Sequence, residues 1–346
     1  MWEIRRYDKG LKEEWNAFVK KARNSTFLFD RGYMDYHADR FEDHSLLAYR
    51  NGKLSAVLPA NIVKESSIQN DSDYEDKTLY SHQGLTYGGW VWDSKGLDTV
   101  DIYDLWKLWL KYCKRQGIGK IIYKRLPYIY SRQPSDEDQY MLFLSEAKSL
   151  QTNIASAIDL HQNPGYNKLQ KRHLKQNEES YVGKQIDAQD KEAVKEFHAM
   201  LTACLEERHD ARPVHTLEEL QKLIESFPEN IRIWTAFLRG EKELMAGVCA
   251  YITETTAHCQ YIATSSRGRE LNILASLFKE MIEYYTAVGL RYFDFGTSNE
   301  GNGWLLNSGL NRQKTSYGGS GVAYQAFEIS IVSALESLPN ELWPPK

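Results

Sequence analysis

Hydrophobic and polar positions follow the same succession of patterns in the two halves of the chain. Glu3–Asp8 and Val182–Asp187 each read as a short strand, and each is followed by a segment with apolar residues at helical spacing. Four residues of the first segment recur at an offset of 179 residues: Asp8, Lys12, Glu13 and Phe18 correspond to Asp187, Lys191, Glu192 and Phe197. This recurrence predicts two copies of one structural unit.

The likeness continues beyond these segments. In the first half, the expected elements are strands at 45–49, 54–63 and 81–83, a helix around 105–113 and a strand at 120–125. In the second half, they are strands at 231–238, 244–252 and 257–260, a helix over 274–288 and a strand at 291–295. Gly117 and Gly289 stand where a left-handed residue ends a helix.

The predicted fold is therefore α/β, of the α+β kind. It comprises two tandem units, each with a mixed, mainly antiparallel sheet flanked by helices. We place the units at 1–160 and 161–346, and the second begins with a basic helix at 164–179. The acidic stretch Glu65–Lys77 has no counterpart in the second half and is expected to form a polar loop.

Composition narrows the functional classes. The chain has 346 residues, of which 42% are hydrophobic and 26% charged, and its formal charge is −4. These values exclude a collagen-like, wholly disordered or disulfide-rich miniprotein and argue against a general nucleic-acid binder. The charged start Met1–Arg6 lacks the apolar core of a signal peptide, and no apolar run is long enough to span a membrane. The four scattered cysteines suit a reducing compartment, so we expect a cytoplasmic protein.

Two segments carry a resemblance to a known family. They are Ser81–Gly89 and Asp294–Gly301, the latter continuing through Leu306–Leu310 to Lys314. With the repeated order of elements, the chain resembles the GNAT acyltransferase superfamily, in particular its tandem FemAB/FemX-like branch. That resemblance implies transfer of an acyl or aminoacyl group from acyl-CoA or aminoacyl-tRNA to an amine. It also implies a link to the bacterial cell envelope.

The pyrophosphate-binding loop of that superfamily has a partial match here. Thr264–Asn272 opens a helix and carries Arg267, Gly268 and Arg269, but with a different spacing. The chain also lacks the long helical-hairpin insertion of the branch that uses aminoacyl-tRNA. The resemblance therefore leaves both donors open, and it implies that Arg267, Gly268 and Arg269 bind the donor.

Two histidines fall on strands that the repeat predicts to be equivalent, His82 and His258. A histidine there would polarise a carbonyl or accept the proton of an amine, or else would be a hydrogen-bonded structural residue. Strand periodicity places His258, Gln260 and Ile262 on one face and Cys259, Tyr261 and Ala263 on the other. His258 is the preferred catalytic candidate because Gln260 shares its face.

A basic segment precedes the second unit. On a helix, its cations recur on one face and would bind a phosphate of CoA, of tRNA or of a nucleotide-linked sugar. Alternatively, this face is a solvated helix surface that joins the two halves. The residues are Lys168, Lys171, Arg172 and Lys175.

Three further segments supply candidate ligand-binding residues. In 208–216, Thr216 and Glu219 fit a helix capping box, and four residues would line a ligand mouth: Arg208, His209, Arg212 and His215. The spacing lacks partners for zinc, so no metal is expected. Tyr87, Gly88 and Gly89 mark either a close backbone approach to a ligand or a turn. A loop rich in Gly and Asn, structural or functional, carries Asn299, Glu300, Asn307 and Lys314.

The predicted function is acyl or aminoacyl transfer to a small-molecule, peptide or nucleotide-linked amine, without a metal. His258 and Glu300 are the candidate proton acceptors, and Gln260 and Tyr261 join the substrate-binding candidates. Two alternatives remain open. One is a non-catalytic GNAT-like protein that binds a nucleotide-linked or peptide ligand, and the other is tRNA binding through the basic helix.

Overall fold

The computed structural model describes residues 1–342 except 65–76 and Asp210, and it leaves out the side chains of His37, Arg208 and His209. Apart from Lys77, the acidic stretch Glu65–Lys77 lies outside the described residues. The chain forms two compact units. Unit 1 comprises 1–153, 302–304 and the residues from 323 onward, and unit 2 comprises 154–301 and 305–322. The residues from 323 onward thus group with the N-terminal unit, whereas the sequence-based division at 160/161 places them in the second unit.

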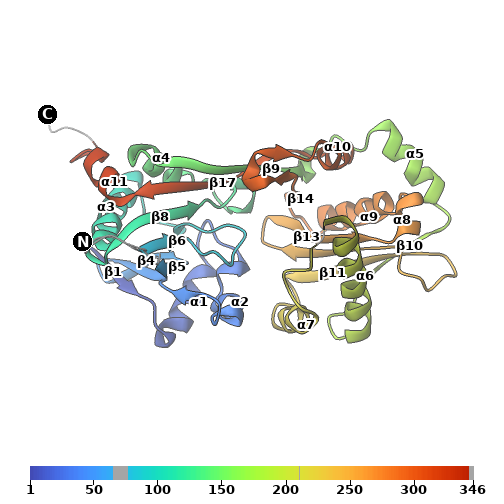
Figure 1. Ribbon diagram of the computed structural model, residues 1–346, viewed down its shortest axis with the longest axis horizontal. Helices are drawn as coiled ribbons and strands as arrows, with labels where there is room; N and C mark the ends of the chain where they lie inside the picture. Colours follow the sequence, from blue (N-terminus) through green and yellow to red (C-terminus); the bar gives the residue numbers. More distant parts are fainter. Residues whose placement is uncertain (65–76, 210, 343–346) are drawn as a thin grey trace, which may run out of the picture. The chain divides into compact units, whose positions relative to one another are not determined.

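Unit 1 is built on antiparallel strands and one parallel pair (Figure 1). Its sheets have the orders β1-β3-β4-β7 and β17-β8-β6-β5-β2, and only the β6–β8 ladder is parallel among the strand pairs described within the unit. Its strands are β1 (Trp2–Arg6), β2 (Glu42–Asp43), β3 (Leu46–Arg50), β4 (Lys53–Leu58), β5 (Asn61–Lys64), β6 (Lys77–Tyr80), β7 (Val91–Trp92), β8 (Ile118–Lys124) and most of β17 (Ser320–Ser330). Its α-helices are α1 (Lys12–Val19), α2 (Arg31–Met34), α3 (Thr99–Arg115), α4 (Glu137–Leu144) and α11 (Ile331–Ser337).

Unit 2 has the strand order β10-β11-β12-β13-β14-β9, with β13 and β14 parallel. Helix α9 covers one face of this sheet, and α6 and α7 lie against the other (Figure 1). The strands are β9 (Lys148–Asp159, from Ile154), β10 (Tyr181–Gln185), β11 (Ile231–Leu238), β12 (Ala246–Ile252), β13 (Thr256–Thr264), β14 (Tyr292–Thr297), β15 (Asn299–Glu300) and β16 (Leu305–Leu306). The helices are α5 (Lys168–Asn177), α6 (Lys191–His209), α7 (Leu217–Ser226), α8 (Ser266–Glu270), α9 (Leu274–Ala287) and α10 (Ser308–Ser316).

The internal repeat is confirmed in the strand order. Strands β1, β3, the β4–β5 pair, β6 and β8 of unit 1 correspond to β10, β11, β12, β13 and β14 of unit 2. In both units the long helix, α3 or α9, connects the two strands that pair in parallel. Gly117 and Gly289 follow these helices with φ of 68° and 85°, as a left-handed helix end requires.

The units differ in their fourth strand, which is β6 in unit 1 and β13 in unit 2. In unit 2, β13 runs without interruption, whereas in unit 1 β6 ends at Tyr80 and β7 begins only at Val91. His82 lies in the intervening loop with a φ of 73°, while His258 lies within β13. The expectation that the two histidines occupy equivalent strands is therefore wrong, because a loop interrupts the strand in unit 1.

The core of unit 1 is filled by aromatic rings. Trp90, Trp92, Trp106 and Trp109 are each at most 1% exposed, and their rings stack or meet edge to face. Tyr123 of β8 packs edge-on against Trp106 and accepts a hydrogen bond from the Trp90 amide at 2.8 Å. Such large rings contribute much of the hydrophobic stabilisation of a domain.

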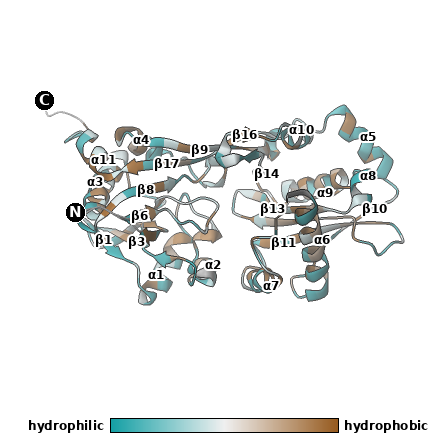
Figure 2. Ribbon diagram, viewed as in Figure 1, coloured by the Kyte–Doolittle hydropathy of each residue, from teal (hydrophilic) through white to brown (hydrophobic). Residues whose placement is uncertain are grey.

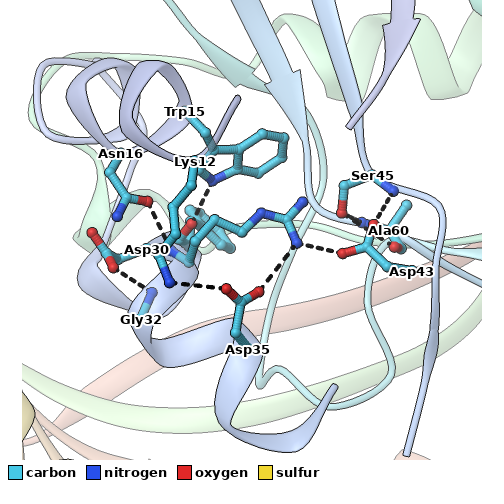
Figure 3. Close-up of polar contacts among 11 residues, drawn as sticks. Lys12, Trp15, Asn16, Asp30, Gly32, Asp35, Asp43, Ser45 and Ala60 are labelled. Carbon is cyan, nitrogen blue, oxygen red and sulfur yellow. Dashed lines mark hydrogen bonds and ion pairs between the residues drawn. The ribbon is translucent and has the colours of Figure 1, made fainter. Parts of the chain in front are cut away.

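A buried cation fixes the start of α2 in unit 1. The Arg31 guanidinium is paired with the Asp43 carboxylate, and Asp35 lies 3.8 Å away (Figure 3). Its carbon lies 3.4 Å from the ring centroid of Tyr7 and 4.3 Å from that of Trp15. The side chain is only 1% exposed, so its charge depends on these neighbours rather than on water.

We expect Asp43→Asn to lower the free energy of unfolding by roughly 2–4 kcal/mol, because it leaves the buried Arg31 charge without its close carboxylate. Urea unfolding followed by circular dichroism measures this loss. The matched control is Lys53→Ala. It breaks the ion pair between Asp93 and Lys53, and the Lys53 side chain is 71% exposed. That change is expected to cost less than about 1 kcal/mol. Equal losses in the two variants would contradict this account of Arg31.

Candidate active site

The central feature of unit 2 is a short parallel ladder that ends abruptly. Strands β13 and β14 pair only at Thr256–Tyr292, Ala257–Phe293 and His258–Asp294. Beyond these pairs β13 continues along β12 to Thr264, while β14 reaches β9 through Thr297 and Ala155. The two strands therefore separate in the middle of the sheet and leave a gap in its hydrogen bonding.

A β-bulge at Gln260 changes which side chains share a face. Ala250 pairs with Cys259 and Cys249 pairs with Tyr261, so Gln260 has no opposite residue in β12. Paired residues lie on the same face of a sheet, and the bulge adds one residue to β13. The expected alternation is therefore wrong beyond Gln260. Ile262 lies on the face of Cys259, and Tyr261 lies on the face of His258.

A cavity of about 420 Å³ opens where the strands separate. Its apolar wall comes from β13, α9 and β14, and includes Ile262, Phe278 and Phe295. Helices α6 and α10 and the segment that leads into α9 complete it. In the described part of the chain, its polar lining consists of Thr264, Arg269, Asn272, Gln313, Lys314 and Tyr317, and includes no Asp or Glu.

His258 is oriented by a buried carboxylate. Its Nδ1 lies 2.8 Å from Asp294 Oδ2, and Asp294 is completely buried. The other oxygen of Asp294 accepts a hydrogen bond from the Gly296 amide at 2.8 Å. Since an ionised carboxylate only accepts hydrogen bonds, Nδ1 carries the proton in this pair. Such an arrangement fixes the orientation and tautomer of the ring.

Lys314 of α10 is a buried ammonium at the cavity wall. Its Nζ donates to the carbonyl oxygens of Gly296 at 3.0 Å and Thr297 at 2.6 Å, and the residue is 6% exposed. Burial lowers the pKa of Lys314 to about 8, although the nearby Asp294 opposes this shift. Gly296 thus connects the two candidate groups, because its carbonyl accepts from Lys314 and a Cβ added at Gly296 would lie 3.4 Å from His258 Cε1.

The cysteine at this position is unsuited to covalent catalysis. Cys259 is buried, and desolvation together with Asp294 raises the pKa of its thiol well above the ordinary value. The thiolate is the nucleophilic form of cysteine. Cys259 is therefore a poor candidate for a covalent nucleophile.

The three predicted donor-binding residues of α8 have different surroundings. Arg267 is exposed and paired with Glu241 and Glu243 at 2.5 and 3.1 Å. Arg269 lines the cavity, donates to the Thr264 carbonyl and is paired with Glu207. Gly268 is buried at the cavity wall, and an added Cβ would lie 2.1 Å from the Met245 carbonyl oxygen. Of the two arginines, only Arg269 lines this cavity.

The predicted loop residues 299–307 form a hairpin beside α10. Asn299 Oδ1 accepts from the Ile154 amide at 2.6 Å, and Asn307 caps α10 through the Leu310 amide. Asn307 also donates to Glu300, which is exposed. Glu300, Asn299 and Asn307 are not among the residues that line the cavity, whereas Lys314 is.

The predicted residues around Thr216 have different surroundings. Thr216 and Glu219 form the predicted capping box of α7. His215 is buried, and its Nδ1 lies 2.5 Å from the Tyr261 hydroxyl. Arg212 is exposed and lies 3.4 Å from Glu206, while the side chains of Arg208 and His209 lie outside the described part of the chain.

The predicted basic helix forms as α5, with Asn167 as its N-cap. Its four cations are exposed, and none has an ion pair with a described residue. In unit 1, Gly88 and Gly89 pack against the protein itself, since an added Cβ would lie 1.8 Å from the Ser81 carbonyl and 2.6 Å from the Tyr123 hydroxyl. Tyr87 is buried and contacts Thr26.

Sequence reasoning missed several residues of the cavity and its border. Asp294 was part of a resembling segment but was not assigned a role, and its register opposite His258 is the signal that would have found it. Thr264, Asn272, Gln313 and Tyr317 were also missed. Among the described residues, no cluster of His, Cys, Asp and Glu is arranged to bind a metal, and no helix has the length and apolarity to span a membrane.

Comparison with known proteins places this geometry in context. Residues 168–302 match the family model of the acetyltransferase (GNAT) domain. FemX has a similar fold, with a TM-score of 0.65 and 12% identity over 94% of this chain and 96% of that one. For L-PGS from Bacillus licheniformis the TM-score is 0.54 and the identity 12%, over 94% of this chain and 96% of that one. For a tandem GNAT protein from the clavulanic acid biosynthesis pathway the TM-score is 0.50 and the identity 10%, over 96% of this chain and 99% of that one. No curated protein matches the sequence.

We expect Lys314→Met to remove a pH-dependent term from the free energy of unfolding. The pKa of Lys314 is lowered to about 8 in the folded protein, so between pH 8 and about 10.5 the unfolded chain binds more protons. Wild-type stability should therefore rise relative to Lys314→Met by up to about 1.4 kcal/mol per pH unit in this window. Urea unfolding at pH 8 and pH 10 tests this, with the half-exposed Lys279→Met as control. A constant difference between wild type and Lys314→Met would contradict it.

Proposed function

Since the chain contains a GNAT acetyltransferase domain within a FemX-like fold, we propose that unit 2 transfers an acyl group from acyl-CoA to an amine. One observation carries the proposal. The cavity at the separated strands is lined by the buried Lys314 ammonium, which donates to the Gly296 carbonyl, and the Gly296 amide in turn donates to the Asp294 carboxylate that pairs with His258. A cavity with an apolar wall and a few placed polar groups is the usual form of a small-molecule site.

The cavity lining favours an acyl-CoA donor over an aminoacyl ester. An aminoacyl group carries an α-ammonium, which needs a carboxylate or several acceptors when it leaves water. Among the residues that the structure describes, the lining provides two cations, Arg269 and Lys314, and no carboxylate. The apolar wall of Ile262, Phe278 and Phe295 instead suits an uncharged acyl chain and the neighbouring pantetheine arm.

The reaction follows from these groups. The amine nitrogen attacks the thioester carbonyl carbon, the carbon–sulfur bond breaks, and CoA leaves as its thiolate. His258 accepts the proton that the nitrogen loses, and Asp294 stabilises the resulting imidazolium. The Lys314 ammonium stabilises the negative charge on the carbonyl oxygen of the tetrahedral intermediate. The acceptor is an amine of a small molecule, a peptide or a nucleotide-linked compound.

We expect His258→Ala to lower kcat/KM for acyl transfer from acetyl-CoA by about 10²–10⁴-fold, because it removes the proton acceptor. Lys314→Met should lower it by about 10²–10³-fold. The rate should also fall above pH 8 in the wild type as the Lys314 ammonium loses its proton. The assay uses a panel of amine acceptors, and His82→Ala is the control because His82 lies in a loop of unit 1.

An equal loss of activity in His82→Ala would move the active unit to the first half. Tight acetyl-CoA binding without turnover on any acceptor would support the alternative of a non-catalytic binding protein.

Filling the cavity provides a test that needs no acceptor. We expect Leu205→Trp, on the α6 wall, to abolish CoA binding measured by calorimetry, because the larger ring occupies the space between the strands. Val288→Trp is the matched control, since Val288 is 55% exposed after α9 and does not line the cavity. Unchanged CoA affinity in a folded Leu205→Trp protein would place the donor elsewhere.

A further inference from the structure

A hairpin in the second half of the chain exposes a cluster of apolar side chains. Trp304, Leu305 and Leu306 are consecutive residues that are 87%, 63% and 50% exposed, and Leu310 follows on α10 with 37%. Exposed apolar residues are ordinary when scattered, but a contiguous group of this kind marks an interaction site. We call Trp304, Leu305, Leu306 and Leu310 the apolar tip.

The backbone holds the apolar tip outward in a defined conformation. Gly301, Asn302 and Gly303 all have positive φ, of 56°, 55° and 94°. β15 pairs with β16 through Asn299–Leu306 and Glu300–Leu305. Asn adopts this left-handed conformation more readily than most L-residues, so Asn302 and the two glycines define the turn that precedes the apolar tip.

The basic helix α5 is attached to the same helix as the apolar tip. Asn167, the N-cap of α5, donates its amide hydrogen to the Ser316 carbonyl at 3.0 Å, and the Gln170 side chain donates to Ser316 Oγ at 3.0 Å. Ser316 ends α10, whereas Leu306 immediately precedes the Asn307 cap of α10. The nine residues of α10 span roughly 14 Å, so the tip and α5 lie about one short helix apart.

Positive charge is concentrated on the two helices of this edge. Helices α5 and α10 carry no Asp or Glu, and Figure 2 shows α5 largely in the hydrophilic colour. Carboxylates adjoin the helices at Glu300 of the hairpin and at the C-terminal end of α5, where Glu178, Glu280 and Glu283 line a cavity with Lys175. Five cations on the two helices are exposed and have no ion pair with a described residue: Lys168, Lys171, Arg172, Lys175 and Arg312. The chain as a whole has a net charge of −4, so these cations are locally concentrated.

We infer that this edge, formed by the apolar tip, α10 and α5, docks the chain onto an anionic phospholipid bilayer. Trp and Leu side chains insert at the boundary between headgroups and acyl chains, and Trp is enriched there. Basic residues within a Debye length of the surface add attraction to anionic lipids. An apolar anchor and a basic patch together supply the two contributions that stable peripheral binding requires.

A second copy of the chain fits the apolar tip less well. A stable protein interface uses about 800 Å² and 20–30 residues from each partner, whereas the apolar tip has four side chains. Docking on a bilayer would also place α10, which lines the cavity with Leu310, Gln313 and Lys314, at the membrane surface. An acceptor amine at that surface would then be close to the donor cavity.

The experiment is flotation of the full chain with vesicles of phosphatidylcholine alone or with 30% phosphatidylglycerol, at 0.1 and 0.5 M salt. We expect binding to the anionic vesicles that weakens at high salt. Trp304→Ser with Leu306→Ser should reduce it at least tenfold. The fourfold change of Lys168, Lys171, Arg172 and Lys175 to Gln should reduce it similarly and remove the salt dependence. Phe143→Ser is the matched control, since Phe143 is 74% exposed on α4.

Three outcomes would overturn the inference. They are absence of binding to either vesicle, equal loss in Phe143→Ser, and a concentration-dependent dimer that Trp304→Ser dissociates without any vesicle binding. Circular dichroism confirms that each variant is folded. None of these measurements depends on acyl transfer, so their failure and that of the proposed function are distinguishable.

Discussion

The three-pair parallel ladder between β13 and β14 is the constraint on which the candidate site depends. It brings His258 opposite Asp294 and then ends, while β14 pairs with β9 on its other side, so the β14 groups beyond Asp294 that would face β13 need other partners. Lys314 satisfies two of those groups, the carbonyls of Gly296 and Thr297. A buried ammonium is costly without acceptors, and interrupted strand ends are costly without donors, so each compensates for the other.

Unit 1 meets the same constraint in another way. Lys124 ends β8 and donates to the carbonyls of His82, Gln83 and Leu85 in the loop between β6 and β7. Burial lowers the pKa of Lys124 to about 8, as for Lys314. The space beside β8 is filled by Tyr123 and tryptophan rings rather than left as a cavity. Both units thus satisfy carbonyls near interrupted strands with a buried lysine, Lys124 from the end of β8 in unit 1 and Lys314 from α10 in unit 2. In the part of the chain that the structure describes, only unit 2 combines this lysine with a cavity and a histidine–carboxylate pair.

Much of the architecture was predictable because local signals specify it. Periodicity located the strand Ile231–Leu238 and the long helices, and helix ends followed from Gly117, Gly289 and the capping box of Thr216. The bulge at Gln260 was not predictable, because it depends on the register between β12 and β13 and leaves the residue alternation unchanged. The burial of Lys314 was hidden for a similar reason. It lies in a polar segment, and its acceptors come from a strand end 17 residues earlier.

The order in which the chain groups its residues has a consequence for biosynthesis. Unit 2 is nearly continuous, from 154 to 322 except 302–304, whereas unit 1 combines the N-terminal residues with those from 323 onward. Strand β17 pairs with β8 through Ala326–Lys124 to Ser330–Lys120, about 200 residues apart in sequence. During translation, unit 2 is complete once residue 322 has been added. The sheet of unit 1 keeps an open edge along β8 until residues 326–330 have followed. An unpaired edge of this kind favours association with other chains, so co-translational chaperones have a defined segment to protect.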